Sequence, residues 1–368
     1  MNRLQQLIRK FSPNGVEFIE FGQACSTLMA SKKINKKDYK DKGKYPIIDQ
    51  GQNFIVGYTD DETSVLSKDE YVIFGDHTRE IKFVNFEFAQ GAEGLKILKA
   101  KERILPKYLY YALCNARIPN RGYNRHWNIV KNILFPLPPL PVQQEIVRIL
   151  DSFSEFTTKL IEQLTAELVA RKQQYEYYKD LLLEFNDNVK WVRLADIAEI
   201  GTGSSNTNEE MEDGKYPFFV RSQEVRYKND YEFDETAIIT SGDGVGVGRV
   251  FHYVEGKYAL HQRAYRIHII DKKVIPKYYF YYMKNSFLSY IKRNAVYASV
   301  TSVRKYMLEN FPVPIPPLKE QQLIVNILDR FTPLINDLTN NISAEIEARQ
   351  KQYEYYRDKL LDFKEVAS

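Results

Sequence analysis

Two segments of the chain carry nearly the same text. Residues 136–185 and 314–363 align without a gap, and about half of the paired positions are identical. Each copy opens with a proline-rich word, "PLPPLPVQQEIV" or "PIPPLKEQQLIV", and closes with a tyrosine-rich one, "RKQQYEYYKDLLLEF" or "RQKQYEYYRDKLLDF". A repeat of this length restricts the fold to an architecture that uses one structural unit twice.

Both copies predict a long amphipathic helix. Proline favours the first helical turn, so the helices should begin near Val142 and near Lys319. Apolar residues then recur in steps of three and four, the heptad pattern of a coiled coil, across roughly 40 residues or about 60 Å. Two matching seams in one chain most simply pack on each other, and the alternative is that each seam lies on its own globular domain. The seam positions are Ile146, Leu150, Phe153, Thr157, Leu160, Leu164, Arg171, Tyr175, Tyr178 and Leu182, and in the second copy Ile324, Leu328, Phe331, Ile335, Leu338, Ile342, Arg349, Tyr353, Tyr356 and Leu360.

The segments outside these helices repeat more weakly. The word "GKYP" occurs in both, and "RILPKYLYYALCN" matches "KVIPKYYFYYMKN". Alternating apolar runs predict short strands and the Pro-Lys-Tyr words predict helices, so each segment indicates an α/β unit of about 130 residues. The predicted fold class is α+β, a tandem duplication with domains at residues 1–135 and 188–313 and long helices at residues 136–187 and 314–368.

Composition excludes several classes of protein. The 368 residues are 44% hydrophobic and 27% charged, which suits a globular chain with two or three cores. The absence of a long apolar run and of an N-terminal signal segment predicts a cytoplasmic protein without a membrane span. Cys25 and Cys114 lack metal-ligand spacing, and we expect both as buried small side chains. A net charge of +4 and 27 tyrosines fit a nucleic-acid partner without requiring one.

Candidate catalytic motifs are sparse. The glycine-rich stretch "SGDGVGVGRV" fits neither common phosphate-binding motif, and a tight hairpin explains it better. The Pro-Pro pairs lack the flanking residues of amino-group DNA methyltransferases. Asp76, Glu80 and Lys82 resemble the Asp…Glu-x-Lys site of metal-dependent nucleases, in which carboxylates hold Mg²⁺ and the lysine steadies the attacking water. The alternative is that Glu80 and Lys82 share one solvated face of a strand, and the second half has Val247 in the place of Glu80.

Polar, basic and aromatic residues gather instead in presumed loops. Arg and Gln can read guanine and adenine edges with two hydrogen bonds, while Ser, Thr and Tyr suit phosphates. Any one of them alone is compatible with an ordinary solvated residue, but the set favours DNA. The candidate DNA contacts are Arg79, Lys82, Gln90, Arg121, Tyr123, Arg125 and His126 in the first half, and Arg221, Gln223, Arg226, Arg249, His261, Gln262, Arg263, Tyr297, Ser299, Thr301 and Arg304 in the second.

The order of these elements resembles the specificity subunit of type I restriction-modification systems. The resemblance rests on the Pro-Pro-Leu-x-x-Gln-Gln word before a heptad helix, present twice, and it covers nearly the whole chain. It implies two target recognition domains that each bind one half of a split site in double-stranded DNA. It also implies two docked methyltransferase subunits, which bring S-adenosylmethionine and the catalytic residues, and restriction subunits that cut or translocate DNA. This chain is then expected to be non-catalytic and to hold neither cofactor nor metal.

The duplication also makes geometric predictions. Two domains folded back through antiparallel helices should lie about a pseudo-twofold axis, as two-fold related groove readers require, and helix length should set the spacer between half-sites. Tyr177 and Tyr355 fall off the heptad seam, so we predict that they contact the methyltransferase. The alternative function, a metal-dependent DNA nuclease that uses Asp76, Glu80 and Lys82, predicts cleavage by the purified chain.

Overall fold

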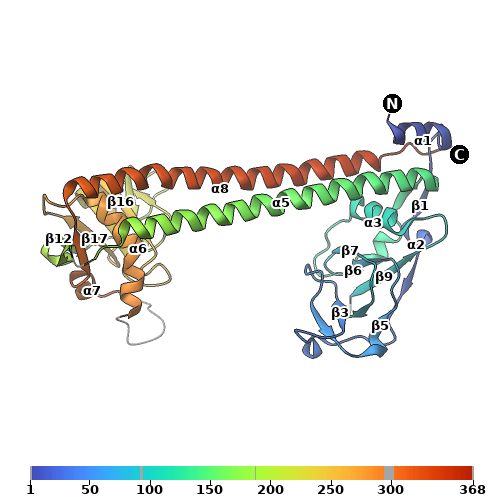
Figure 1. The fold of residues 1–368 in the computed structure, drawn as a ribbon, viewed down its shortest axis with the longest axis horizontal. Coiled ribbons are helices and arrows are strands. Elements are labelled where there is room, and N and C mark those ends of the chain that lie inside the picture. Colours follow the sequence, from blue (N-terminus) through green and yellow to red (C-terminus); the bar gives the residue numbers. More distant parts are fainter. Residues whose placement is uncertain (1, 92–93, 187, 294–301, 367–368) are drawn as a thin grey trace. The chain divides into compact units, whose positions relative to one another are not determined.

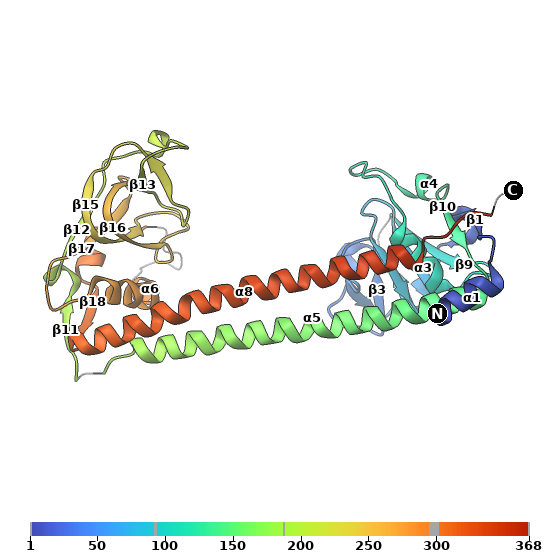
Figure 2. The ribbon, with the colours of Figure 1, turned by 90° about the horizontal axis from the view of Figure 1, so that it is seen from above.

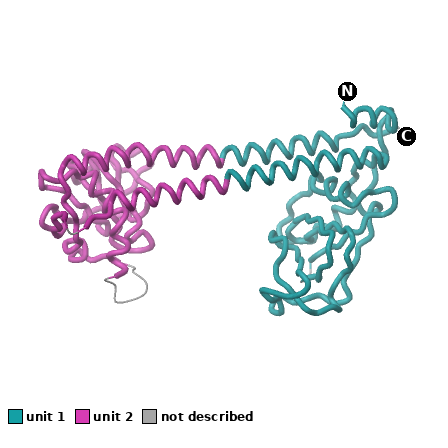
Figure 3. Tube along the Cα trace, in the orientation of Figure 1, with its two compact units in different colours: residues 1–164, 344–368 teal, residues 165–343 magenta. Residues whose placement is uncertain are grey.

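The chain divides into two compact units (Figure 3), one made of residues 1–164 and 344–368 and the other of residues 165–343. A computed structural model describes residues 2–91, 94–186, 188–293 and 302–366 (Figure 1). Each unit holds one α/β domain together with one end of helix α5 (Leu140–Leu183) and one end of helix α8 (Leu318–Leu360). The prediction of a duplicated domain followed each time by a long helix is therefore confirmed.

The first unit contains two small sheets and a separate strand pair. Its elements are α1 (Arg3–Phe11), β1 (Glu17–Glu20), α2 (Phe21–Ala24), β2 (Cys25–Leu28), β3 (Tyr45–Ile48), β4 (Gly57–Thr59), β5 (Val65–Leu66), β6 (Tyr71–Gly75), β7 (Ile81–Val84), β8 (Phe88–Gln90), β9 (Leu95–Ala100), α3 (Pro106–Asn115), α4 (Trp127–Val130) and β10 (Leu134–Leu137). The order β2-β9-β6-β7 makes an antiparallel sheet, and β4-β3-β8-β5 makes a second sheet in which β3 and β8 run parallel. β1 pairs with β10 directly before α5.

The second unit repeats this plan with one larger sheet. Its elements are β11 (Lys190–Arg193), β12 (Ala198–Thr202), β13 (Tyr216–Phe219), β14 (Arg226–Lys228), β15 (Phe233–Ser241), β16 (Phe251–Leu260), β17 (Ala264–Ile269), α6 (Pro276–Arg293), α7 (Lys305–Glu309) and β18 (Pro312–Ile315). The sheet order is β12-β17-β15-β16-β13-β14, and β11 pairs with β18 before α8. The long strand β16 takes the place of β7 and β8, so the two sheets of the first unit become one here.

The long helices begin at Leu140 and at Leu318, within two residues of the predicted starts near Val142 and Lys319. Within each unit α5 and α8 lie side by side (Figures 1 and 2) and run antiparallel, since the start of one helix meets the end of the other. The first seam residues of both helices enter the domain cores, where Ile146, Leu150, Ile324 and Leu328 are almost completely buried. The heptad seam therefore serves both helix pairing and attachment to the domain.

A buried glutamine fastens α5 to the first domain. Gln143 Oε1 accepts a hydrogen bond from Leu105 N at 2.9 Å, and its Nε2 donates to the carbonyls of Arg103 at 2.9 Å and Pro138 at 2.7 Å. The side chain is completely buried, so these bonds satisfy main-chain groups that water cannot reach. The first glutamine of the repeated word is thus a structural clamp.

The second unit builds the same clamp. Gln321 accepts from Ile275 N at 2.9 Å and donates to the carbonyls of Lys273 at 3.0 Å and Pro316 at 2.8 Å. It is also completely buried. All three partners are main-chain atoms, as they are for Gln143, so the clamp depends on the backbone path of the domain and on no particular side chain there.

An acidic residue on each long helix forms a second joint. Asp151 of α5 accepts a hydrogen bond from Tyr111 Oη at 2.7 Å and pairs with Lys107 Nζ at 2.6 Å, both from α3. Asp329 of α8 receives the same two contacts from a tyrosine and a lysine of α6, at 2.6 and 2.8 Å. Together with the glutamine clamp, this joint holds each domain at one place on its helix.

Candidate nucleic-acid interface

In the first unit, the loop before α4 is fastened to the turn after β6. Asp76 opens that turn and is almost fully buried. Its Oδ1 accepts from Trp127 N at 2.8 Å, and its carbonyl accepts from His126 N at 2.8 Å. His126 Nε2 in turn accepts from Arg121 N at 3.3 Å. Two segments far apart in the sequence are thereby brought together.

An aromatic stack joins the same two segments. The His77 ring lies on the Tyr123 ring with centroids 4.5 Å apart and planes 9° apart, and Tyr123 is 81% exposed. Arg121 and Arg125 beside it are exposed. We define the first basic surface as Arg79, Arg121, Tyr123 and Arg125.

Arg79 sits in this turn with a φ of 65°, a left-handed conformation that costs a non-glycine residue of order 1–3 kcal/mol. Its Nη1 donates to the carbonyl of Ile118 at 3.4 Å, which links the turn to the loop a second time. Strain at a surface residue that is held from several sides is typical of functional sites.

Lys82 lies elsewhere. The strand pattern predicts a solvated face for Glu80 and Lys82, but Lys82 is only 6% exposed. Its Nζ donates to the carbonyls of Asp49 at 2.9 Å and Asn53 at 2.6 Å, and burial lowers its pKa. The buried ammonium satisfies two main-chain carbonyls, so the predicted solvated face is wrong for Lys82, and we leave it out of the proposed DNA contacts.

Three further predicted contacts are buried. Gln90 Oε1 accepts from Ala30 N at 2.9 Å inside the first domain, and His126 is held by Asp76 as described above. In the second domain His261 Nδ1 accepts from Arg263 N at 3.0 Å. Because these polar atoms are engaged with the main chain, we assign the three residues to loop positioning rather than to DNA contact.

The nuclease alternative does not fit these positions. The carboxylate of Asp76 holds the loop before α4, with Lys96 Nζ 3.8 Å from its other oxygen, and the Lys82 ammonium is bound to two carbonyls. No group of three His, Cys, Asp or Glu side chains in the described part of the chain is placed as metal ligands. Asp76, Glu80 and Lys82 therefore form no metal site.

In the second unit, Asp243 joins two arginines. Its Oδ1 lies 2.9 Å from Arg221 Nη1 and its Oδ2 lies 3.2 Å from Arg263 Nη1. Burial opposes ionisation of Asp243, but the hydrogen bonds from both guanidinium groups outweigh it and lower its pKa. One carboxylate serves two cations, so the cluster keeps an excess of positive charge.

Asp243 and Arg221 border a cavity of about 320 Å³. Arg226 enters it from β14 and pairs with Glu210, and the amide of Gln262 donates to Asn206 nearby. The lining residues are Thr207, Val220, Arg221, Ser222, Arg226, Asp243, Gly244, Val245 and Gly246. We define the second basic surface as Arg221, Gln223, Arg226, Arg249, Gln262, Arg263 and Arg304, of which all but the half-buried Arg226 are exposed. The predicted contacts Tyr297, Ser299 and Thr301 lie outside the described residues.

The Gly-Asp pair of each half has an equivalent role that sequence reasoning missed. Asp76 organises the first basic surface by holding a loop, and Asp243 organises the second by holding two arginines. Asp76 follows Gly75, the last residue of β6, and Asp243 follows Gly242, the first residue after β15. The occurrence of the pair at the same place in both halves was the available signal.

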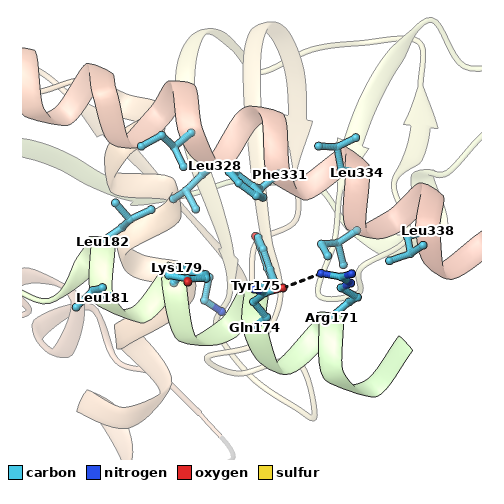
Figure 4. Close-up of a pocket in the computed structure, with 13 residues that line it drawn as sticks. Arg171, Gln174, Tyr175, Lys179, Leu181, Leu182, Leu328, Phe331, Leu334 and Leu338 are labelled. Carbon is cyan, nitrogen blue, oxygen red and sulfur yellow. Dashed lines mark hydrogen bonds between the residues drawn. The ribbon is translucent and has the colours of Figure 1, made fainter. Parts of the chain in front are cut away.

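The long helices present a separate, apolar surface. Tyr177 and Tyr355 are 64% and 53% exposed, so both off-seam tyrosines are accessible, and their contact with a partner stays a prediction. In the second unit Tyr175 of α5 points toward α8 (Figure 4), and its hydroxyl lies 2.9 Å from Thr332 Oγ1. We define the helix groove as the cavity of about 640 Å³ between α5 and α8 lined by Arg171, Gln174, Tyr175, Tyr178, Lys179, Leu181, Leu182, Ile327, Leu328, Phe331, Leu334, Ile335 and Leu338.

Comparison with known proteins agrees with this arrangement. The family described as "Type I restriction modification DNA specificity domain" matches residues 13–170 and 186–348. The Escherichia coli type I restriction enzyme EcoR124I/EcoR124II specificity subunit is 34% identical over an alignment of 400 residues, covering 99% of this chain and 98% of that protein.

Solved structures show the same fold. A chain in a structure of a type I restriction-modification system has a TM-score of 0.71 at 16% identity, covering 96% of this chain and 98% of that one. The HsdS subunit of Thermoanaerobacter tengcongensis has a TM-score of 0.54 at 15% identity, covering 95% and 97%.

Two copies of one domain frame, each followed by a long helix and each carrying its own basic surface, define a non-catalytic recognition protein. The chain belongs to the family of type I restriction-modification DNA specificity subunits. As such a subunit, it serves the DNA specificity of a type I restriction-modification complex. No helix in the described ranges combines the length and apolar character needed to cross a membrane.

Proposed function

We propose that each domain reads one half of a bipartite sequence in double-stranded DNA. The observation that carries this proposal is that two domains attached to their helices in the same way present two different polar surfaces. The clamps at Gln143 and Gln321 use the same atoms at distances that differ by no more than 0.1 Å, whereas the first basic surface uses a stacked tyrosine and the second uses arginines around Asp243. A conserved joint with different recognition residues suits two independent sequence choices.

The chemistry of both surfaces supports readout of DNA. Exposed arginines give phosphate contacts and bidentate contacts to guanine, and Gln223 and Gln262 offer amides of the kind that pair with adenine. Some arginines of these surfaces already form ion pairs with carboxylates, such as Arg226 with Glu210. We therefore expect Arg125, Arg249 and Arg304 to supply phosphate contacts and the cluster around Asp243 to face bases.

The helices serve assembly in this proposal. Two methyltransferase subunits dock on them, with Tyr177 and Tyr355 as contacts, and bring S-adenosylmethionine, while restriction subunits join the complex thereafter. The helix lengths set the spacer between half-sites.

The same proposal fixes the functional divisions of the chain. The domains span residues 1–135 and 188–313, and the helices span residues 136–187 and 314–368. We place the complex in the cytoplasm.

Methylome sequencing of cells that carry this chain with its methyltransferase tests the proposal. We expect methylated adenine in a two-part motif with an unspecified spacer. A continuous motif, or no motif, would show that the bipartite proposal is wrong.

Domain exchange assigns each half. Replacing residues 15–131 by the same segment of a relative should change one half of the motif and leave the other intact. A change in both halves would contradict independent domains. Insertion of one helical turn near the middle of both α5 and α8 is the matched test of the spacer, because it should alter spacing without altering either half-site.

A further inference from the structure

The glycine-rich loop between β15 and β16 presents one apolar side chain outward. Val245 is 98% exposed, the highest value among the exposed large apolar side chains of the described residues. Two other valines of the same stretch, Val247 and Val250, are only 4% and 8% exposed. The loop thus separates its valines into two that pack inward and one that does not, and neither DNA binding by arginine nor folding of the domain explains the outward one.

The loop is held on both sides of Val245. Gly242 N donates to the carbonyl of Arg263 at 2.9 Å, and the carbonyl of Asp243 accepts from Ser241 Oγ at 2.8 Å. On the far side, a Cβ at Gly246 would come within 2.6 Å of the carbonyl oxygen of Arg221, so the backbone packs closely there. Val245 is therefore displayed at the tip of a fastened loop.

The surroundings of Val245 indicate what it meets. It lines the same cavity as Arg221, Arg226 and Thr207. Phosphate oxygens make no favourable contact with an apolar side chain. The major-groove edge of a base pair can, because thymine presents its methyl group in the same groove in which arginine binds the acceptors of guanine. A side chain exposed in the free protein gains by burial against that methyl group.

We propose that Val245 contacts the 5-methyl group of a thymine in the half-site bound by the second domain, and so selects thymine at one position. This inference rests on the bipartite recognition proposed above. The arginines of the second basic surface bind the neighbouring acceptors. The contacts of Asp243 with Arg221, Arg263 and Ser241 hold Val245 at a fixed place beside them. The glycine-rich stretch, which matches no phosphate-binding motif, is in this view a reading loop.

The test uses the full chain in complex with its methyltransferase. Domain exchange first shows which half-site belongs to the second domain. Each thymine of that half, on either strand, is then replaced by uracil, which lacks only the methyl group. We expect one position at which uracil weakens binding about fourfold, the effect of burying one methyl group. Val245→Ala should bind thymine and uracil equally at that position, and Val245→Ile should keep the discrimination.

Val169→Ala is the matched control, because Val169 is an exposed valine of α5 outside both basic surfaces, and this variant should discriminate as the unaltered chain does. The inference is overturned if uracil has no effect at any position, or if Val245→Ala still prefers thymine. If Val245→Ala weakens binding of the thymine duplex and of the uracil duplex by the same factor relative to the unaltered chain, the preference for thymine persists. That result would indicate a wedge between base pairs and would also overturn the inference. Failure of the bipartite proposal is seen separately, as the absence of a two-part methylation motif.

Discussion

The ring of Phe153 stacks on the ring of Tyr353, with centroids 6.0 Å apart and planes 12° apart. Tyr356 closes the same cluster edge-on at 5.6 Å. In the second unit Phe331 occupies the equivalent position of the repeat, but it lines the helix groove and is 51% exposed. The same seam is thus closed in one unit and open in the other.

This difference predicts unequal costs for one substitution made in both halves. Phe153→Ala should lower the free energy of unfolding by about 2 kcal/mol, because it removes a half-buried stack, and Phe331→Ala by about 1 kcal/mol or less. Urea unfolding of both variants checks the expectation. Equal losses would mean that the two seams are equally packed in solution.

The glutamine clamps predict a strong position effect within one dipeptide. Gln143→Leu leaves Leu105 N and two carbonyls buried without their partner, so we expect a loss of about 2–4 kcal/mol in the free energy of unfolding. Gln144→Leu alters an exposed neighbour and should stay within about 0.5 kcal/mol. The pair is measured by urea unfolding, and the second unit offers Gln321→Leu against Gln322→Leu as an independent repeat.

Asp76 should be required for binding of the half-site read by the first domain, and not for catalysis of DNA cleavage. Asp76→Ala removes the bond to Trp127 N, so we expect a stability loss of about 1–3 kcal/mol and weaker binding of the half-site read by the first domain. Glu80→Ala should leave both unchanged. Fluorescence anisotropy with DNA altered in one half-site at a time measures the effect, and magnesium-dependent cleavage by the purified chain that Glu80→Ala abolishes would contradict this account.

Exposed and buried cations should differ in their salt dependence. Arg125→Gln should lower the slope of log binding constant against log salt by about 0.9, the value for one phosphate contact. Lys82→Met should leave that slope unchanged and instead destabilise the first domain, because two carbonyls lose their donor. Titration of the complex at several salt concentrations separates the two cases, and a changed slope for Lys82→Met would place its ammonium at the DNA.

Two buried histidines predict acid sensitivity of the second domain. Burial lowers the pKa of both His252 and His261 from the ordinary 6.5, with the arginines around Asp243 adding to the effect at His261. The unfolded chain then binds protons more readily than the folded one. Stability should be complete above about pH 6.5 and fall as pH drops toward the lowered pKa values. Urea unfolding across about pH 5 to 7.5 measures this, and the double variant His252→Gln, His261→Gln should flatten the curve.

Local signals account for what the sequence predicted well. Pro276 starts α6, as the Pro-Lys-Tyr word predicts, because a proline at the first helical turn acts within one segment. The off-seam positions of Tyr177 and Tyr355 follow from the heptad period, and both side chains are exposed.

Contacts between distant segments could not be predicted in this way. Lys82 and Gln90 have the residue chemistry of DNA readers, but their partners lie some 30 to 60 positions away, at Asn53 and Ala30. Of the two cysteines expected to be buried, Cys25 is buried and Cys114 is only half-buried. Burial of a polar side chain depends on which segments fold over it, and no local pattern records that.

The clamp of Gln143 and Gln321 has a consequence for how such a chain tolerates sequence drift. Each amide binds main-chain N–H and C=O groups, at Arg103 and Leu105 in one unit and at Lys273 and Ile275 in the other. Any residue other than proline supplies the N–H, and every residue supplies the C=O. The joint therefore places almost no demand on the identity of the residues it grips, and mutations can accumulate throughout a domain while its mechanical attachment to the rest of the molecule is inherited unchanged.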